Sequence, residues 1–260
     1  MKKITVIISL FFLFVVSIEN KIVSADEIQE VLDQYSLTGE ELDKFEENEQ
    51  KELKSFSINA QVNLLEEYQK LQEEKLLSED ITYDIFLEMK NTPPPTDKVA
   101  EAYRNSDTRP QAGDIMITNG TSAFGLTGHA GIFLGNGTIL SIAGPGSNPE
   151  ALGILEWSRR YNSEPGDWTK IYRPSSIYQP SLAESWAKNH YLNKKFSYGI
   201  TTDLFSENPT YCSKIVWQAY FYASGYGQMG YKQPLTKIAL PYNLIDYFDT
   251  TPIHVATWGG

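Results

Sequence analysis

The chain has 260 residues, a net charge of −11, three histidines and one cysteine. A single cysteine excludes an internal disulfide. Three scattered histidines without a CxxC or HExxH pattern argue against a metal site, so we expect no cofactor. No region is basic enough to follow a nucleic acid backbone, and nucleic acid is not an expected partner.

Residues 1–25 have the pattern of a secretory signal peptide. Met1-Lys2-Lys3 precedes an almost continuous apolar run from Ile4 to Ile18, and Val23-Ser24-Ala25 is a small-residue cleavage site. The run is shorter than the roughly 20 apolar residues of a membrane-spanning helix. We predict a secreted bacterial protein, extracellular or cell-wall associated, without a stable membrane span after signal removal. An uncleaved anchor is the alternative.

The charge divides the rest of the chain into two regions. Residues 26–90 contain 19 acidic and 6 basic side chains, whereas residues 91–260 contain 13 of each. Apolar residues at helical spacing predict that 26–90 is an all-helical acidic segment, with Ser78 capping its last helix. Its acidic surface is either a solvated face or part of a module that binds, positions or covers a site. A Pro-rich junction at 91–98 leads to a catalytic domain at 99–260.

Short strands and helices follow one another in this domain. Strands are expected at 114–118, 129–134, 139–143, 153–155, 169–172 and 253–256, and helices at 97–103, 156–160, 182–192 and from Cys212 onward. This order indicates an α+β fold with an antiparallel sheet packed on helices. The loop at 119–127 is expected to be mobile.

The segment Gly135-Asn136-Gly137-Thr138 is a type I′ hairpin signal. With Asn136-Gly137 as a two-residue loop, Leu134 lies opposite Ile139 and Ile132 opposite Ser141. This register brings Ser141 within diagonal reach of His129.

Cys212 lies where a helix is expected to begin. Ile215, Val216, Ala219 and Tyr220 repeat at helical spacing, and Asn208-Pro209 precedes them as a helix entrance. Free N–H groups and the macrodipole at a helix start favour a thiolate and are expected to lower the thiol pKa. Cys212 is therefore a candidate nucleophile. The alternative is a small buried hydrophobic residue.

His129 is the best candidate for a base that would activate this cysteine. It begins a strand after a glycine-bearing loop, where catalytic residues are often found. His190 lies on a charged helix and is interpreted as a surface residue, and His254 as a core or edge residue. A neutral imidazole within hydrogen-bond reach takes the thiol proton and later protonates the leaving group.

Three motifs, at 113–115, 128–137 and 211–220, resemble the circularly permuted NlpC/P60 hydrolases, the YiiX/YebB-like papain-type amidases. The resemblance covers roughly residues 97–255 and not 26–90. It implies a papain-like fold with Cys212 as nucleophile and His129 as base. It also implies amide or acyl-bond chemistry, often on peptidoglycan stem peptides.

Two positions depart from the pattern of this family. The third polar catalytic residue, usually Glu, His, Asn or Gln, is Ser141 in this chain, with Glu156 or a bound water as substitutes. Relatives in this family place a tyrosine near the oxyanion, in the loop before the cysteine helix. The nearest aligned residue in this chain is Phe196, and Tyr198 follows two residues later. Tyr198, Tyr211 and Glu156 are candidate oxyanion or substrate contacts, and the Cys212 backbone N–H is a further oxyanion donor.

The leading hypothesis is a secreted cysteine peptidase or amidase that cleaves peptidoglycan stem peptides through a Cys212 acyl-enzyme. A second hypothesis keeps this chemistry and changes the reaction to a thiol amidase, esterase or acyltransferase on lipid or peptide substrates. A third is a catalytically weak module that binds the cell wall. The expected partner is thus peptidoglycan, a peptide or an acyl substrate.

Overall fold

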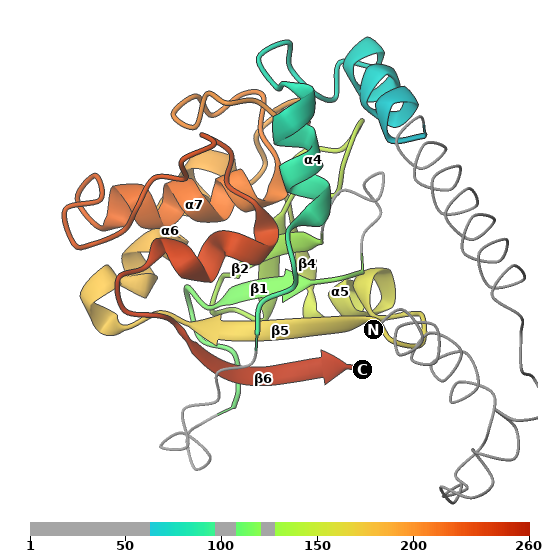
Figure 1. Cartoon of the computed structure of the whole chain (residues 1–260). Coiled ribbons are helices and arrows are strands. Elements are labelled where there is room, and N and C mark those ends of the chain that lie inside the picture. The colour runs from blue at the N-terminus through green and yellow to red at the C-terminus, as the bar shows by residue number, and fades with distance from the viewer. Residues whose placement is uncertain (1–62, 97–107, 121–127) are drawn as a thin grey trace, which may run out of the picture. The chain divides into compact units, whose positions relative to one another are not determined.

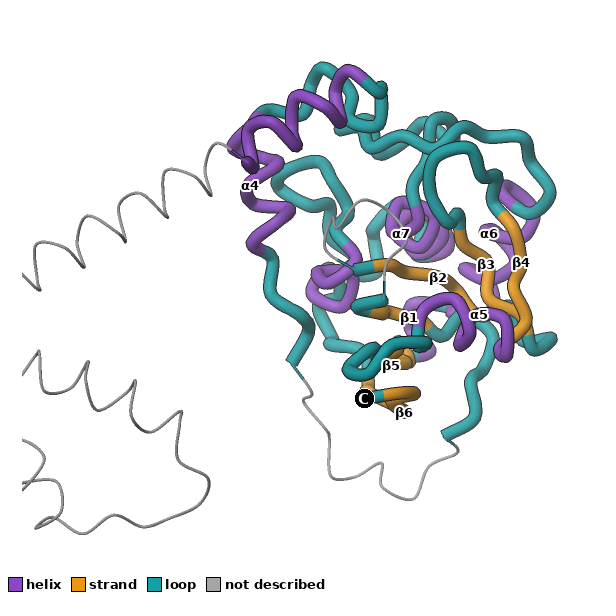
Figure 2. Tube along the Cα trace, turned by 90° about the vertical axis from the view of Figure 1, so that its right-hand side faces the viewer, coloured by secondary structure: helices purple, strands orange, loops and turns teal. Residues whose placement is uncertain are grey.

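A six-stranded antiparallel sheet lies at the centre of the structure (Figure 1). The computed structural model describes residues 63–96, 108–120 and 128–260. The strands are β1 (Ile115–Thr118), β2 (His129–Phe133), β3 (Thr138–Ser141), β4 (Glu150–Gly153), β5 (Trp168–Arg173) and β6 (Ile253–Gly259). Their order is β4-β3-β2-β1-β5-β6, and Figure 2 shows β3 and β4 on one side of β2 and β1, with β5 and β6 on the other.

Helices pack on both faces of this sheet. They are α4 (Tyr83–Asn91), α5 (Ile154–Tyr161), α6 (Pro180–Tyr191) and α7 (Cys212–Ala223), with 3-10 helices at Ser176–Tyr178 and Pro241–Tyr247. Residues 63–73 are also helical. The predicted α+β class is confirmed, and the architecture is compatible with a papain-like fold.

The strand alternation separates two hydrophobic cores. Ala130 and Ile132 of β2 belong to the larger core, which contains the buried face of α7. Phe133 belongs to a smaller core with Trp157 and Tyr161 of α5. Because side chains of a strand alternate between faces, His129 shares the α5 side of the sheet with Phe133. This places the imidazole beside two large aromatic rings.

The β2–β3 hairpin differs from the prediction by one residue. Phe133 pairs with Ile139, which was expected opposite Leu134. The loop therefore spans three residues, 135–137, and its two glycines have φ of +71° and +84°. The Asn136 side chain accepts a hydrogen bond from the backbone after the loop, at 3.2 Å. Glycine at both ends lets the backbone form this longer turn in place of the type I′ loop.

Two further local predictions were wrong. The strand expected at 153–155 is instead β4 at 150–153, and α5 begins directly at Ile154. The N-cap of α4 is Thr82, whose Oγ1 accepts from the Ile85 N–H at 3.3 Å, and not Ser78. The Ser78 hydroxyl donates to Asp80. The helix predicted at 97–103, most of the loop at 119–127 and the helices predicted before residue 63 lie outside the described residues.

The described end of the acidic segment packs into the larger core. Leu71, Leu77, Ile81 and Phe86 are buried in the same cluster as the side chains of α7. Leu77 also forms a parallel bridge with Ile200. Residues 63–91 therefore contribute to the structure that surrounds the start of α7.

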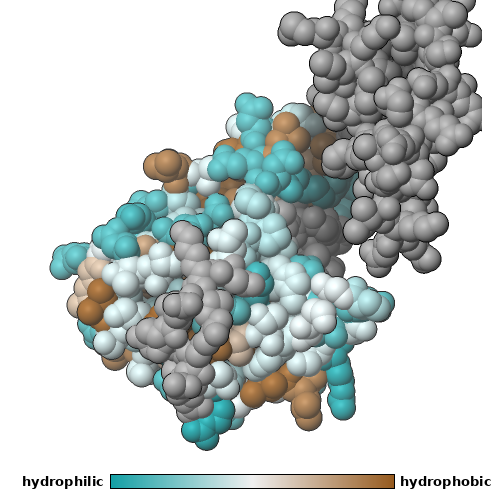
Figure 3. All heavy atoms as spheres, turned by 60° about the horizontal axis from the view of Figure 1, so that its bottom comes forward, coloured by the Kyte–Doolittle hydropathy of each residue, from teal (hydrophilic) through white to brown (hydrophobic). Residues whose placement is uncertain are grey.

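The surface at the β6 edge of the sheet shows no single hydrophobic patch in its described part (Figure 3). Hydrophilic and intermediate residues cover most of this face, and the hydrophobic groups are scattered between them. Among the described residues, no helix is long and apolar enough to cross a membrane.

Replacing Gly113 with alanine is expected to destabilise the fold by at least about 2 kcal/mol. Gly113 has φ of +86°, and a Cβ would lie 2.4 Å from the Pro180 carbonyl oxygen. Its own carbonyl accepts from the Tyr220 hydroxyl of α7, so the segment cannot move freely. Urea denaturation measures the effect. Gly137→Ala is the matched control, because Gly137 has φ of +84° with no atom near its missing Cβ, and it should cost about 1 kcal/mol. Equal losses would contradict the steric argument.

Candidate active site

Cys212 is the first residue of α7, with Tyr211 as the N-cap residue. The prediction of a cysteine in the first turn of a buried helix is confirmed, since only 7% of its surface is exposed. The thiol contacts the Ser213 hydroxyl, with 4.0 Å between Sγ and Oγ. The apolar residues of α7 pack in the larger core and fix the position of the helix start.

The thiol is less acidic than the sequence predicted. Burial raises the pKa of Cys212 above its ordinary value, whereas backbone N–H groups, first that of Ala130, oppose the shift. The prediction that the helix start lowers the thiol pKa is therefore wrong. Desolvation of a thiolate in this buried position outweighs the stabilisation that the N–H groups supply.

His129 is the first residue of β2, and its side chain is almost completely buried. Its Nε2 lies 2.8 Å from the Ser141 Oγ, which confirms the predicted contact between the two residues. Burial lowers the pKa of the imidazole to about 3, and the nearby Arg160 charge acts in the same direction. The ring is therefore neutral at physiological pH.

The hydrogen bonds of Ser141 determine the tautomer of this imidazole. The Ser141 hydroxyl donates its proton to the Ala130 carbonyl oxygen at 2.7 Å. A hydroxyl has one proton, so toward His129 it must act as the acceptor. Nε2 then carries the imidazole proton, and Nδ1 holds the free lone pair. Ser141 thus presents Nδ1 as the basic atom.

Cys212 and His129 line the same cavity, which has a volume of about 30 Å³. Tyr198, Tyr211 and Ser213 are also among its lining residues. In the described structure no hydrogen bond joins the thiol to the imidazole. The sulfur and the imidazole must therefore come within hydrogen-bond distance before a proton can pass between them.

A family model for proteins described as "lipoprotein N-acylation protein LnsA-like" matches residues 81–253, which is more than half of the chain. The chain belongs to this LnsA-like family. Membership implies an enzyme with a papain-like fold. It supports a family related to the one that the motifs resemble, and not NlpC/P60 specifically.

One curated relative of this LnsA-like chain is an uncharacterized 30.3 kDa protein of Bacillus thuringiensis. The two are 39% identical over 149 residues, which cover 53% of each chain. The chain thus spans about half the length of the curated relative it matches. No solved structure matches it.

The remaining predicted site residues lie at different distances from the cavity. Tyr198 is partly buried and lines it. Tyr211 also lines it, but its hydroxyl accepts from the Ala239 N–H at 3.0 Å and so holds a neighbouring loop. Glu156 does not line it: its side chain is 61% exposed on α5 and pairs with Arg160. The structure therefore brings Ser141, and not Glu156, to His129.

Sequence reasoning missed the aromatic side chains around His129. The Tyr161 ring stacks on the imidazole at 4.4 Å between centroids, and the Trp157 ring lies at 5.5 Å. Trp157 is fixed by its Nε1–H, which donates to the Thr169 hydroxyl at 3.0 Å. The signal in the sequence was the spacing of Trp157 and Tyr161, four residues apart on one helix.

The other two histidines are engaged elsewhere. His190 Nδ1 lies 2.6 Å from a Glu207 carboxylate oxygen, and the ring stacks on Trp186. His254 lies on the edge strand β6, with its ring near Tyr172. Within the described ranges, no group of three or more His, Cys, Asp or Glu side chains is placed to hold a metal ion.

Stability is expected to fall below neutral pH because of His129. Its pKa is about 3 in the folded chain and 6.5 in the reference state, so between these values the unfolded chain binds a proton that the folded chain does not. The stability that the neutral His129 imidazole contributes is fully present above pH 6.5 and is lost progressively as the pH falls toward 3. Between pH 7.5 and pH 5 the free energy of unfolding should drop by about 2 kcal/mol.

Urea denaturation at pH 7.5, 6 and 5 measures this slope, with His129→Gln as the control. The variant lacks the titrating ring but retains a neutral side chain that can hydrogen-bond. It should show a flatter dependence over the same range. Parallel curves for the two proteins would show that other groups cause the decline.

Proposed function

We propose that the chain is a cysteine acyltransferase, in which Cys212 carries an acyl group as a thioester and passes it to an amine. The observation that carries this proposal is the shared cavity of Cys212 and His129, with Ser141 fixing the tautomer that leaves Nδ1 basic. The family description names lipoprotein N-acylation, which suggests a polypeptide amine as the acceptor. The predicted signal peptide would place the reaction outside the cell.

The residues support two proton transfers at one atom. As the thiol attacks the acyl carbonyl, Nδ1 of His129 takes the thiol proton, and it returns this proton to the leaving group when the tetrahedral intermediate collapses. An amine then attacks the thioester, and Nδ1 takes the proton that the amine loses. Collapse of the second intermediate expels the Cys212 sulfur, which receives that proton. The backbone N–H of Cys212 is a candidate donor to the oxyanion.

The cavity admits only small groups, since about 30 Å³ is room for about two water molecules. Its volume therefore does not select between water and an amine as the acceptor of the acyl group. The neutral thiol and imidazole suit a reaction in which charge develops only when the substrate is bound.

A second candidate uses the same acyl-enzyme with water as acceptor. The motifs resemble amidases that act on peptidoglycan stem peptides, so a secreted cysteine peptidase that cleaves cell-wall amides remains the alternative. In both candidates Cys212 is the nucleophile and His129 the base. The acceptor decides between them.

The deciding experiment follows the acyl group by mass spectrometry of the intact mature chain. The protein is mixed with p-nitrophenyl octanoate, and then with either a peptide that has a free amino terminus or purified peptidoglycan. An octanoyl adduct on Cys212 that moves to the peptide amine supports the transferase. Rapid loss of the adduct to water, together with new muropeptide fragments, would favour the amidase. A chain that forms no adduct and releases no fragments would rule out both.

A further inference from the structure

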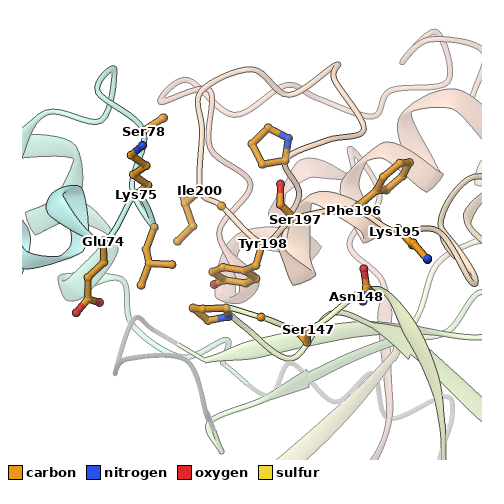
Figure 4. A pocket seen from close by; sticks show the side chains of 15 residues that line it. Glu74, Lys75, Ser78, Ser147, Asn148, Lys195, Phe196, Ser197, Tyr198 and Ile200 are labelled. Atoms are coloured by element: carbon orange, nitrogen blue, oxygen red, sulfur yellow. The ribbon is translucent and has the colours of Figure 1, made fainter.

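Figure 4 shows the side chains that line a groove of about 700 Å³. Tyr198 and Ile200 line both this groove and the cavity at Cys212, so they form a wall common to the two spaces. The cavity itself, at about 30 Å³, holds little more than the reacting atoms. The rest of any substrate must lie elsewhere, and ligand sites typically occupy 300–1,000 Å³.

Three segments that are distant in sequence form the walls of this groove. Figure 4 shows the segment 195–200 between Glu74 and Lys75 on one side and the loop of Ser147 and Asn148 on the other. Seven charged or polar side chains are among those that line it: Glu74, Lys75, Ser78, Ser147, Asn148, Lys195 and Ser197. Apolar side chains, among them Leu76, Phe196 and Ile200, line it as well, so the groove offers both polar and apolar contacts.

The backbone at Tyr198 provides an open position for an extended chain. Thr210 pairs with the residues on either side, accepting from the Gly199 N–H and donating to the Ser197 carbonyl, both at 3.0 Å. The N–H and C=O of Tyr198 itself therefore point away from Thr210. Within the described residues, neither group has a hydrogen-bond partner.

The next position along the same side is already paired. The Ile200 N–H donates to the Leu76 carbonyl at 2.9 Å, and the Ile200 carbonyl accepts from the Ser78 N–H at 2.9 Å. By alternation, the free groups of Tyr198 face this same side. Lys75, at φ of +57°, turns the chain away before it can pair with Tyr198. Among the described residues, no strand therefore pairs with Tyr198 on this side, and Tyr198 lines the groove.

The charges at the rim select the kind of peptide. Neither Lys75 nor Lys195 forms an ion pair with the described residues, whereas Glu74 lies 3.9 Å from Lys70. The two ammonium groups of Lys75 and Lys195 outnumber the single carboxylate, that of Glu74, which also lines the groove. They favour a ligand that carries carboxylates.

We infer that this groove binds an extended, acidic peptide, whose backbone pairs with the N–H and C=O of Tyr198 and whose carboxylates lie near Lys75 and Lys195. The inference rests on the proposed function, because it takes Cys212 as the reacting centre that the peptide approaches. The groove would position the amine of this peptide, or its scissile amide, at the mouth of the cavity. Main-chain pairing would supply affinity, and the two lysines would supply selectivity.

Peptide binding is measured with the mature Cys212→Ala chain, which binds without reacting. The probes are fluorescein-labelled hexapeptides of sequence GSESES and GSKSKS, followed by fluorescence anisotropy. The acidic probe should bind about fivefold more tightly. Lys195→Glu should abolish this preference, and the matched control Lys194→Glu should retain it, because Lys194 does not line the groove.

Backbone pairing is measured separately with the acidic probe methylated at one amide nitrogen at a time. Methylation of one particular amide, the one that donates to the Tyr198 carbonyl, should weaken binding about fivefold. Methylation of the other amides should have little effect. Equal affinity for all methylated probes would overturn the pairing. Equal effects of Lys195→Glu and Lys194→Glu would overturn the site, as would displacement of the peptide by decanoate.

These results are independent of the reaction at Cys212. An octanoyl adduct on the wild-type cysteine together with charge-insensitive peptide binding would overturn the groove and leave the proposed function standing. Selective peptide binding without any adduct would support the groove and contradict the proposed function. Asn148 lines the groove and forms no hydrogen bond among the described residues. Asn148→Trp would fill the groove, and it should lower the affinity for the acidic probe as Lys195→Glu does.

Discussion

Replacing Cys212 with alanine is expected to abolish the acyl-enzyme, a loss of at least about 10⁴-fold in its rate of formation. No other cysteine exists in the chain. The hydroxyl of Ser213, next to the sulfur, donates to the Ala239 carbonyl at 2.6 Å and is held away from the reaction. Stopped-flow release of p-nitrophenol from p-nitrophenyl octanoate measures the burst that acylation produces.

The alanine variant should fold like the parent chain, because it loses one sulfur atom and no strong hydrogen bond. Thermal unfolding of both proteins provides this control. Ser185→Ala, at an exposed position of α6 outside the lining of the cavity and the groove, is a second control and should leave the burst unchanged. A full burst in the folded Cys212→Ala variant would place the nucleophile elsewhere and end the proposal of a thioester.

Replacing His129 with glutamine is expected to slow acylation about 10²- to 10⁴-fold. In the parent chain the Ser141 Oγ lies 2.8 Å from Nε2 of His129. Glutamine can keep a hydrogen bond to this hydroxyl, but it has no atom that accepts a proton near neutral pH. The remaining reaction would depend on thiolate formed by the solvent. Burial raises the pKa of this thiol, so acylation by the variant should increase steadily with pH well above neutrality.

His190→Gln is the matched control for this substitution. His190 lies partly exposed on α6, engaged with Glu207 and Trp186, and its loss should leave acylation unchanged. The pH dependence separates a base from a structural residue, since a merely structural loss would lower the rate without changing the shape of its pH profile. If His129→Gln retains more than a tenth of the parental rate, another group accepts the thiol proton.

The sequence was sufficient to locate the two central residues of the site. Helical spacing after Asn208-Pro209 placed Cys212 at a helix start, which the structure confirms. The contact between His129 and Ser141 was predicted even though the hairpin register was off by one residue. Either register leaves Ser141 near the beginning of β2, so this prediction tolerated the error.

The environment of these residues could not be predicted from local pattern. The thiol pKa depends on how completely Cys212 is desolvated, and that depends on packing against segments distant in sequence. The stacking of Tyr161 on His129 requires α5 to lie on the strand that begins at His129. The groove is formed by segments near residues 75, 147 and 197, which no short motif connects.

The buried, uncharged state of Cys212 has a consequence for how the thiol resists oxidation. Oxidants such as hydrogen peroxide react with thiolates far faster than with thiols. Desolvation keeps the sulfur protonated, and the cavity of about 30 Å³ limits access to it. The thiol would thus be protected from sulfenic acid formation until a substrate draws its proton to His129. The same burial that makes the resting enzyme a weak nucleophile would preserve it for repeated turnover.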